Sequence, residues 1–227
     1  MNEVAFSFGV GELATPTSAR HYHAGQAGQA TGAARATLVL AHGAGAPQSH
    51  PWMVAMARAL AARGIDVVTF NFLYAEARRR APDRPAVLEA TWRAAIDAVR
   101  ARSGPSRLGI GGKSMGGRIA TQVAAEAGVE VDRLVLLGYP LHPPGKPGQL
   151  RVKHLPRVRA PMLFVQGSRD AFGTPEELTP HLAGLASGTR LFIVDGGDHS
   201  LGTPKRAGGS LDQTMARVAD EIARFMA

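Results

Sequence analysis

The chain has 227 residues, 45% of them hydrophobic, and this predicts one large core in a single domain over residues 1–227. The absence of cysteine excludes disulfides, thiolate nucleophiles and cysteine metal sites. The formal net charge is +8, but the densest basic group is brief and has no neighbouring aromatic residues that would stack on bases, so nucleic acid is not an expected partner. This group comprises Arg78, Arg79, Arg80 and Arg84.

The first 36 residues are rich in glycine, alanine and threonine and are weakly patterned apart from Val4–Val10. We expect one or two antiparallel edge strands here and a flexible turn around Gly25–Gly32. Residues 1–20 lack the features of a secretory signal, and no apolar run reaches about 18 residues. We therefore expect a soluble, cytoplasmic protein with no membrane partner.

Short apolar runs then alternate with longer segments of helical periodicity. This alternation is typical of an α/β fold with a mainly parallel central sheet and helices on both faces. The predicted strands are Thr37–Ala41, Ile65–Phe70, Arg107–Gly111, Arg133–Leu137, Pro161–Gln166 and Arg190–Val194.

Apolar residues recur on one face of two predicted helices. Capping-box patterns, Thr174 with Glu177 and Ser210 with Gln213, predict where two helices begin. The two apolar faces comprise Leu88, Trp92, Ala95, Ile96 and Val99, and Leu211, Met215, Val218, Ile222 and Phe225.

The segment from Gly112 to Gly116, Gly-Lys-Ser-Met-Gly, lies between a predicted strand and a helical pattern. Small residues two positions before and after a serine let the strand and helix pass closely, as a nucleophile elbow requires. We predict Ser114 as a nucleophile. The helix that follows directs its first amides, beginning with Met115, toward the atom that the hydroxyl attacks.

The same residues also resemble the end of a phosphate-binding loop, because Gly-Lys-Ser closes a Walker A sequence. That motif requires a glycine where Arg107 stands, and a dinucleotide pattern begun at Gly109 requires one at Ser114. The acidic residue for magnesium is also missing, since Asp132 precedes its strand. The sequence therefore argues against nucleotide binding.

A serine hydroxyl is a weak nucleophile until an adjacent base takes its proton. In folds with such an elbow, the acid and then the histidine follow later in the chain, on loops at the carboxyl ends of strands. Asp170 follows the strand that ends at Gln166, and His199 follows the strand that ends at Val194. We predict His199 as the base and Asp170 as the acid that orients it.

Two competing carboxylates, Asp195 and Asp198, flank the histidine on its own loop and are poorly placed to reach its far ring nitrogen. The other histidines have no motif, and no histidine pair has convincing metal-ligand spacing, so no metal site is predicted. They include His21, His23, His154 and His181.

The segment from His42 to Ala46, His-Gly-Ala-Gly-Ala, follows the first clear core strand. Its glycines let backbone amides approach the negative oxygen that develops when a carbonyl is attacked. We predict the amides of Ala44 and Met115 as the oxyanion donors, with His42 bracing the loop.

Together these residues resemble the α/β-hydrolase superfamily, in particular its small dienelactone-hydrolase-like members. Four segments resemble a subgroup that includes the hydrolase-like region of a chromatin acetyltransferase-complex subunit, in which a lysine at position 113 is usual. The resemblance runs from about Thr37 to the end and implies a sheet of the eight-stranded type, Ser114, Asp170 and His199 as a triad, and no cofactor. The four segments are residues 42–46, 111–118, 138–146 and 166–170.

The connection between Leu137 and Pro161 is short, and its prolines favour an extended loop over a helical lid. We expect no substantial cap domain and an open, shallow site with Tyr139, Leu141 and His142 along its rim. The alternative is that this loop merely covers the sheet.

The expected function is that of a serine hydrolase, of the carboxylesterase or thioesterase type. Its partner would be a small-molecule ester or thioester, which it cleaves through an acyl-enzyme. The alternative is a catalytically idle scaffold or binding protein with the same fold.

Overall fold

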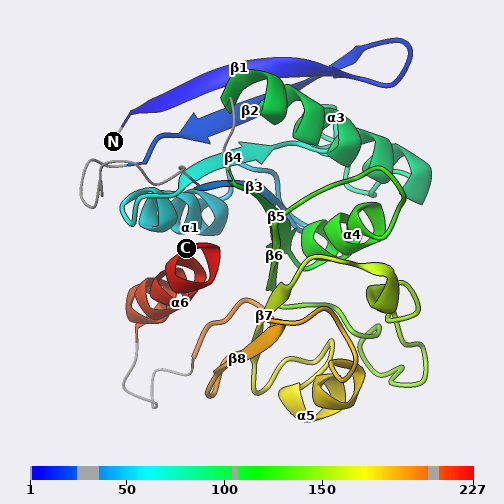
Figure 1. Ribbon diagram of the computed structural model, residues 1–227, viewed down its shortest axis with the longest axis vertical. Helices are drawn as coiled ribbons and strands as arrows, with labels where there is room; N and C mark the ends of the chain where they lie inside the picture. Colours follow the sequence, from blue (N-terminus) through cyan, green and yellow to red (C-terminus); the bar gives the residue numbers. More distant parts are fainter. Residues whose placement is uncertain (1, 25–35, 104–106, 204–209) are drawn as a thin grey trace.

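The computed structural model describes residues 2–24, 36–103, 107–203 and 210–227, and in these ranges eight strands form one sheet. The strand order is β1-β2-β4-β3-β5-β6-β7-β8 (Figure 1). β1 and β2 pair antiparallel, as do β2 and β4, and all later neighbours pair parallel. The strands are β1 (Glu3–Val10), β2 (Thr15–Tyr22), β3 (Ala36–Ala41), β4 (Asp66–Phe70), β5 (Arg107–Lys113), β6 (Arg133–Leu137), β7 (Met162–Gly167) and β8 (Arg190–Val194).

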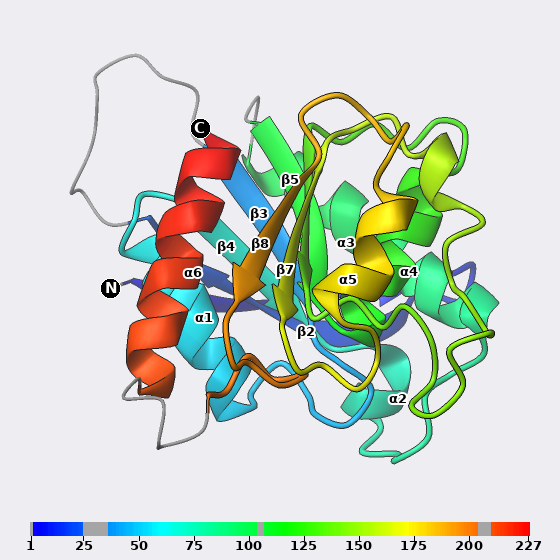
Figure 2. The ribbon, with the colours of Figure 1, turned by 90° about the horizontal axis from the view of Figure 1, so that it is seen from below.

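Helices cover both faces of this sheet, with α1 and α6 on one side and α3 and α4 on the other (Figures 1 and 2). The helices are α1 (Pro51–Ala61), α2 (Leu73–Glu76), α3 (Pro85–Ser103), α4 (Met115–Ala124), α5 (Pro175–Leu178) and α6 (Leu211–Met226), with 3-10 turns η1 (Leu155–Arg157) and η2 (Thr179–His181).

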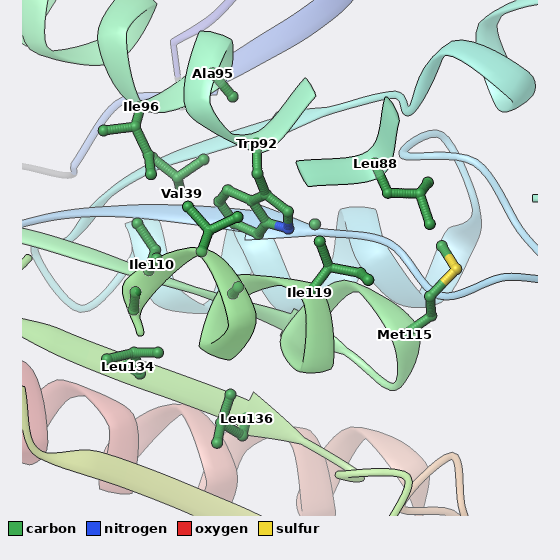
Figure 3. Close-up of a cluster of buried hydrophobic side chains, with 14 of the residues drawn as sticks. Val39, Leu88, Trp92, Ala95, Ile96, Ile110, Met115, Ile119, Leu134 and Leu136 are labelled. Carbon is green, nitrogen blue, oxygen red and sulfur yellow. The ribbon is translucent and has the colours of Figure 1, made fainter. Parts of the chain in front are cut away.

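The central strands are buried on both faces because helices cover the sheet on each side. In β3, Leu38 packs in the core beneath α1 and α6, while its neighbour Val39 packs in the core beneath α3 and α4. Trp92 of α3 lies against Val39 in this second core (Figure 3), and its Nε1 donates to the Gly116 carbonyl oxygen at 3.2 Å. The core thus reaches directly to the segment that carries the predicted nucleophile.

The predicted strands all form, with ends that differ by up to two residues; the strand begun at Arg107 continues to Lys113. The antiparallel edge strands are confirmed as β1 and β2, whereas the turn around Gly25–Gly32 lies outside the described residues. Both capping boxes are confirmed at the starts of α5 and α6. Leu211, placed on the apolar face of the last helix, is 42% exposed because it begins α6 beyond the edge of the core.

The connection from β6 to β7 contains only the short turn η1, so no lid domain is inserted there, as predicted. The four arginines of the basic group are exposed, which agrees with a solvated loop face. Within the described ranges, no helix combines the length and apolar composition that crossing a bilayer requires.

Candidate active site

The elbow is a tight turn between β5 and α4. Ser114 has φ 49° and ψ −115°, a strained backbone conformation that persists where its surroundings enforce it. Neighbouring glycines allow the close packing that holds this conformation. A Cβ at Gly112 would lie 2.4 Å from the Ala41 carbonyl oxygen. A Cβ at Gly116 would lie 2.6 Å from the carbonyl oxygens of Ala41 and His42. The end of β3 therefore packs against the elbow so closely that only glycine fits at these two positions.

The structure brings together the three residues predicted for the triad. The Ser114 Oγ lies 2.8 Å from His199 Nε2, and His199 Nδ1 lies 2.8 and 2.9 Å from the two carboxylate oxygens of Asp170. An ionised carboxylate only accepts hydrogen bonds, so Nδ1 carries the ring hydrogen and donates a hydrogen bond to Asp170. Nε2 is then an acceptor for the Ser114 hydroxyl, which is the arrangement that a general base requires.

Asp170 is held by further hydrogen bonds in a site where its side chain has no exposed surface. The Phe172 N–H donates to Oδ1 at 2.8 Å, and the Gln166 side-chain amide donates to Oδ2 at 2.9 Å. Gln166 also accepts from the Tyr139 N–H at 2.8 Å, so it joins the acid loop to the end of β6. These donors provide hydrogen-bond partners for a carboxylate that has no access to water.

The loop that carries His199 is fixed through its backbone. Lys113 Nζ donates to the His199 carbonyl oxygen, and Trp52 Nε1 donates to the Ser200 carbonyl oxygen at 3.0 Å. The Trp52 ring lies 5.8 Å below the Lys113 ammonium, within cation–π range. The Phe172 ring stacks on the imidazole with the centroids 4.1 Å apart. The imidazole is thus held at its face and through its main chain.

Lys113 has unusual electrostatics for a lysine. Burial lowers the pKa of its ammonium to about 8, and the negative charges of Asp170 and Asp198 act in the opposite direction. The side chain therefore gains or loses its proton close to neutral pH, beside the loop that positions the imidazole.

His42 braces the predicted oxyanion loop. Its Nε2 accepts from the Phe72 N–H at 3.2 Å, and its Nδ1 donates to the Gly43 carbonyl oxygen at 2.7 Å. Burial lowers the pKa of His42 to about 4, so the ring is neutral near pH 7, as these two bonds require. The Tyr74 hydroxyl donates to the Ala44 carbonyl oxygen at 3.0 Å.

This loop lies beside the nucleophile, because a Cβ at Gly43 would be 3.6 Å from the Ser114 Cβ. Met115 is the first residue of α4, where backbone N–H groups have no partner within the helix. The amides of Ala44 and Met115 thus belong to the two segments that meet at Ser114, and their role as oxyanion donors stays a prediction.

The competing aspartates stabilise their own loop. Asp198 accepts from the Ser200 and Gly202 N–H groups at 2.7 and 3.0 Å, and Asp195 lies 3.4 Å from the Ser168 hydroxyl. Neither carboxylate has a hydrogen bond to the His199 ring, in agreement with the choice of Asp170.

The three residues expected along the rim of the site, Tyr139, Leu141 and His142, are all buried, which favours the alternative that this loop covers the sheet. The Tyr139 hydroxyl donates to the Arg151 carbonyl oxygen at 2.7 Å, and burial raises the pKa of Tyr139 to about 12. Leu141 packs closely on Gly173, since a Cβ added at Gly173 would lie 2.5 Å from the Leu141 Cβ. The loop folds back and covers the sheet, and any substrate contact of these residues stays a prediction.

Three positioning residues were not found from the sequence. Gln166 and Phe172 lie within four residues of Asp170, and a polar side chain at the end of an apolar strand was a signal for Gln166. Trp52 lies 148 residues before its partner Ser200, and no local pattern joins them.

The elbow after β5, the mainly parallel sheet and the helices on both faces define an α/β-hydrolase fold. Residues 34–227 match the family described as alpha/beta hydrolase domain, and the chain belongs to this family. The predicted fold class is thus confirmed.

Solved structures agree on the fold. A lid-less α/β serine hydrolase from Xanthomonas campestris is 20% identical with a TM-score of 0.76, over 99% of this chain and 95% of that one. A dienelactone hydrolase from Anabaena variabilis is 22% identical with a TM-score of 0.73, over 99% and 96%. An α/β serine hydrolase homologue from Coxiella burnetii is 18% identical with a TM-score of 0.74, over 100% and 99%. The finer resemblance to a chromatin-complex subunit stays a prediction.

Proposed function

We propose that the protein is a serine hydrolase that cleaves small esters or thioesters through a triad of Ser114, His199 and Asp170. The observation that carries the proposal is the continuous hydrogen-bonded chain from the Ser114 Oγ through the imidazole to the Asp170 carboxylate. The strained turn at Ser114 supports it, because backbone strain of this kind concentrates at functional sites. Membership of a hydrolase family supports the reaction class.

In the proposed reaction, His199 Nε2 takes the Ser114 proton while Oγ attacks the carbonyl carbon and forms a new C–O bond. The imidazolium then gives this proton to the departing alcohol or thiol as its bond to the acyl carbon breaks. Water attacks the acyl-enzyme, gives a proton to His199, and the acid leaves as Oγ recovers that proton. Asp170 keeps the ring in the required tautomer and stabilises the imidazolium throughout.

The negative oxygen of each tetrahedral intermediate would be held by the amides of Ala44 and Met115. Removing one such donor in hydrolases costs about 10²- to 10³-fold in turnover, so the brace provided by His42 and Tyr74 matters for rate. This part of the proposal is supported by the close approach of Gly43 to Ser114.

The absence of an inserted lid between β6 and β7 supports a small or exposed acyl group as substrate. The His199 side chain is 21% exposed and Ser114 is half-buried, so a carbonyl presented from solvent can approach the hydroxyl. A long, fully enclosed acyl chain would need walls that a lid usually provides.

A panel of short- and long-chain p-nitrophenyl esters and matched thioesters tests this proposal. We expect the wild type to turn over the short-chain members fastest and Ser114→Ala to lose the activity. Equal activity of wild type and Ser114→Ala would contradict the triad. A folded protein that turns over no member of the panel and reacts with no serine-directed probe would favour the idle scaffold.

A further inference from the structure

A second group of polar side chains lies away from Ser114, at the amino end of β4. It consists of His21 near the end of β2, His23 just after that strand, and Asp66, the first residue of β4; we call it the histidine cluster. We propose that the histidine cluster binds a divalent transition-metal ion, with Zn²⁺ as the best match to its ligands.

The sheet brings these three residues together. His21 pairs with Val68 across the antiparallel β2–β4 ladder, and side chains two residues apart on an extended chain point to the same side. His23 therefore shares a side with His21, and Asp66 shares that side with Val68. The potential ligand atoms of the three residues all lie within 4.8 Å of one another.

The distances suit a small tetrahedral ion. With zinc–nitrogen and zinc–oxygen bonds of about 2.0–2.2 Å, two ligand atoms of a tetrahedral site lie about 3.3–3.6 Å apart. His21 Nε2 is 3.2 Å from Asp66 Oδ1, and His23 Nδ1 is 3.7 Å from the same oxygen. The His23 side chain is 38% exposed, so an ion can reach the cluster from solvent.

The ligand types also favour a borderline metal over magnesium or calcium. Two imidazoles and one carboxylate form a three-ligand set typical of zinc, with a fourth position left for water, whereas the harder ions prefer oxygen ligands alone. The Asp66 side chain is only 9% exposed, and in such a site the attraction of a neighbouring cation is stronger than in bulk water.

A plain ion pair explains the cluster less well. One imidazole is enough to pair with Asp66, yet the rings of His21 and His23 lie with centroids only 3.9 Å apart. A single metal ion would instead bind both rings and the carboxylate at once.

The proposed site is separate from the triad. Asp66 begins β4, whereas Ser114 follows the carboxyl end of β5, and β3, β4 and β5 run parallel. A metal at the histidine cluster would tie β2 to β4 and close the antiparallel part of the sheet. We therefore expect it to affect stability rather than ester hydrolysis.

The test is Zn²⁺ titration by calorimetry, using untagged full-length protein that has been treated with chelator and desalted. We expect the wild type to bind about one equivalent with micromolar or tighter affinity. His21→Gln and His23→Gln should each weaken binding at least tenfold, since glutamine keeps a hydrogen-bond donor but is a poor zinc ligand. His181→Gln is the matched control outside the cluster, and His199→Gln tests for binding at the triad; both should bind as the wild type does.

Thermal unfolding with and without Zn²⁺ provides the second readout. We expect the ion to raise the Tm of the wild type and of His181→Gln, but not of the two cluster variants, because only a folded cluster binds it. Absence of micromolar Zn²⁺ binding by the wild type would overturn the proposal. Equal binding by the wild type and both cluster variants would overturn it too.

Discussion

Two aspartates at opposite edges of the parallel sheet, Asp170 and Asp132, make different kinds of contact. At the carboxyl edge, Asp170 is fully buried and bonds an imidazole that in turn bonds a serine. At the amino edge, Asp132 is exposed, and it bonds the Leu108 backbone, through its carboxylate at 2.7 Å and its own N–H at 2.8 Å. One carboxylate orients another side chain, whereas the other holds two strand ends together.

This difference shows where the molecule concentrates its chemistry. The carboxyl edge carries the strained residue Ser114 and the desolvated cation Lys113. Such features cost stability, so they are expected where function requires them. Substitutions at the two edges should therefore differ in their effects on activity and stability.

The largest effect is expected at the nucleophile. Ser114→Ala and, separately, His199→Ala should lower kcat/KM for a short-chain ester by at least about 10³-fold, because each removes a part of the reacting chain. Circular dichroism should show unchanged folding. Full activity of the folded Ser114→Ala variant would show that the reaction does not use the proposed nucleophile at the carboxyl edge.

The two aspartates provide the next comparison. Asp170→Asn should lower kcat by roughly 10³- to 10⁴-fold, because an amide no longer holds the imidazole in the tautomer that accepts the serine proton.

Asp132→Asn is the control at the opposite edge. It should leave kcat unchanged and lower the free energy of unfolding by about 1 kcal/mol, the usual worth of a hydrogen bond to the backbone. Similar losses of activity in both variants would mean that Asp170 acts only through the fold.

The tight packing of the elbow predicts a stability difference between two glycines. Gly116→Ala should lower the free energy of unfolding by about 1–3 kcal/mol, since its Cβ would lie 2.6 Å from two backbone carbonyl oxygens. Gly148→Ala has nothing within 4 Å of its added Cβ and should be nearly neutral. Urea titration of both variants measures the difference, and equal stabilities would contradict the packing argument.

Replacement of Lys113 is expected to have a smaller effect on kcat/KM and to change its pH dependence. Lys113→Met should lower kcat/KM about tenfold, because the His199 carbonyl loses its charged donor and a small misplacement of the base is costly. In the wild type, kcat/KM should fall as pH rises through the lysine pKa of about 8, and this alkaline limb should be absent in the variant.

The free energy of unfolding should rise with pH in the range where kcat/KM falls. The pKa of Lys113 is about 8 in the folded protein and 10.5 for an ordinary lysine, so between these values the unfolded state binds more protons. Stability contributed by this group therefore rises with pH across that window. Urea titrations on either side of the window should show the rise in wild type and not in Lys113→Met.

Most of the carboxyl edge could be predicted from the sequence, because its signals are local. Gly112 and Gly116 mark the elbow, and Asp170 and His199 each follow a short apolar strand within a few residues. Spacing along the chain thus predicted which loops would meet.

The features that were missed have a weak local signal or depend on long-range packing. Helix α1 was not predicted; it begins after His50, whose ring accepts from the Trp52 N–H at 3.2 Å, and histidine is not among the preferred capping residues. The burial of Tyr139 depends on how a proline-rich loop folds back onto Phe164 of β7. The histidine cluster depends on the register between β2 and β4, which no local pattern in either strand specifies.

The most direct test of the triad is labelling with a fluorophosphonate probe, followed by mass spectrometry of the modified peptide. Such probes react with a serine whose hydroxyl is activated by an adjacent base. We predict a single adduct on Ser114 in the wild type, much slower labelling in His199→Ala, and none in Ser114→Ala. An unlabelled Ser114 in folded wild-type protein, or an adduct that persists in Ser114→Ala, would contradict the account.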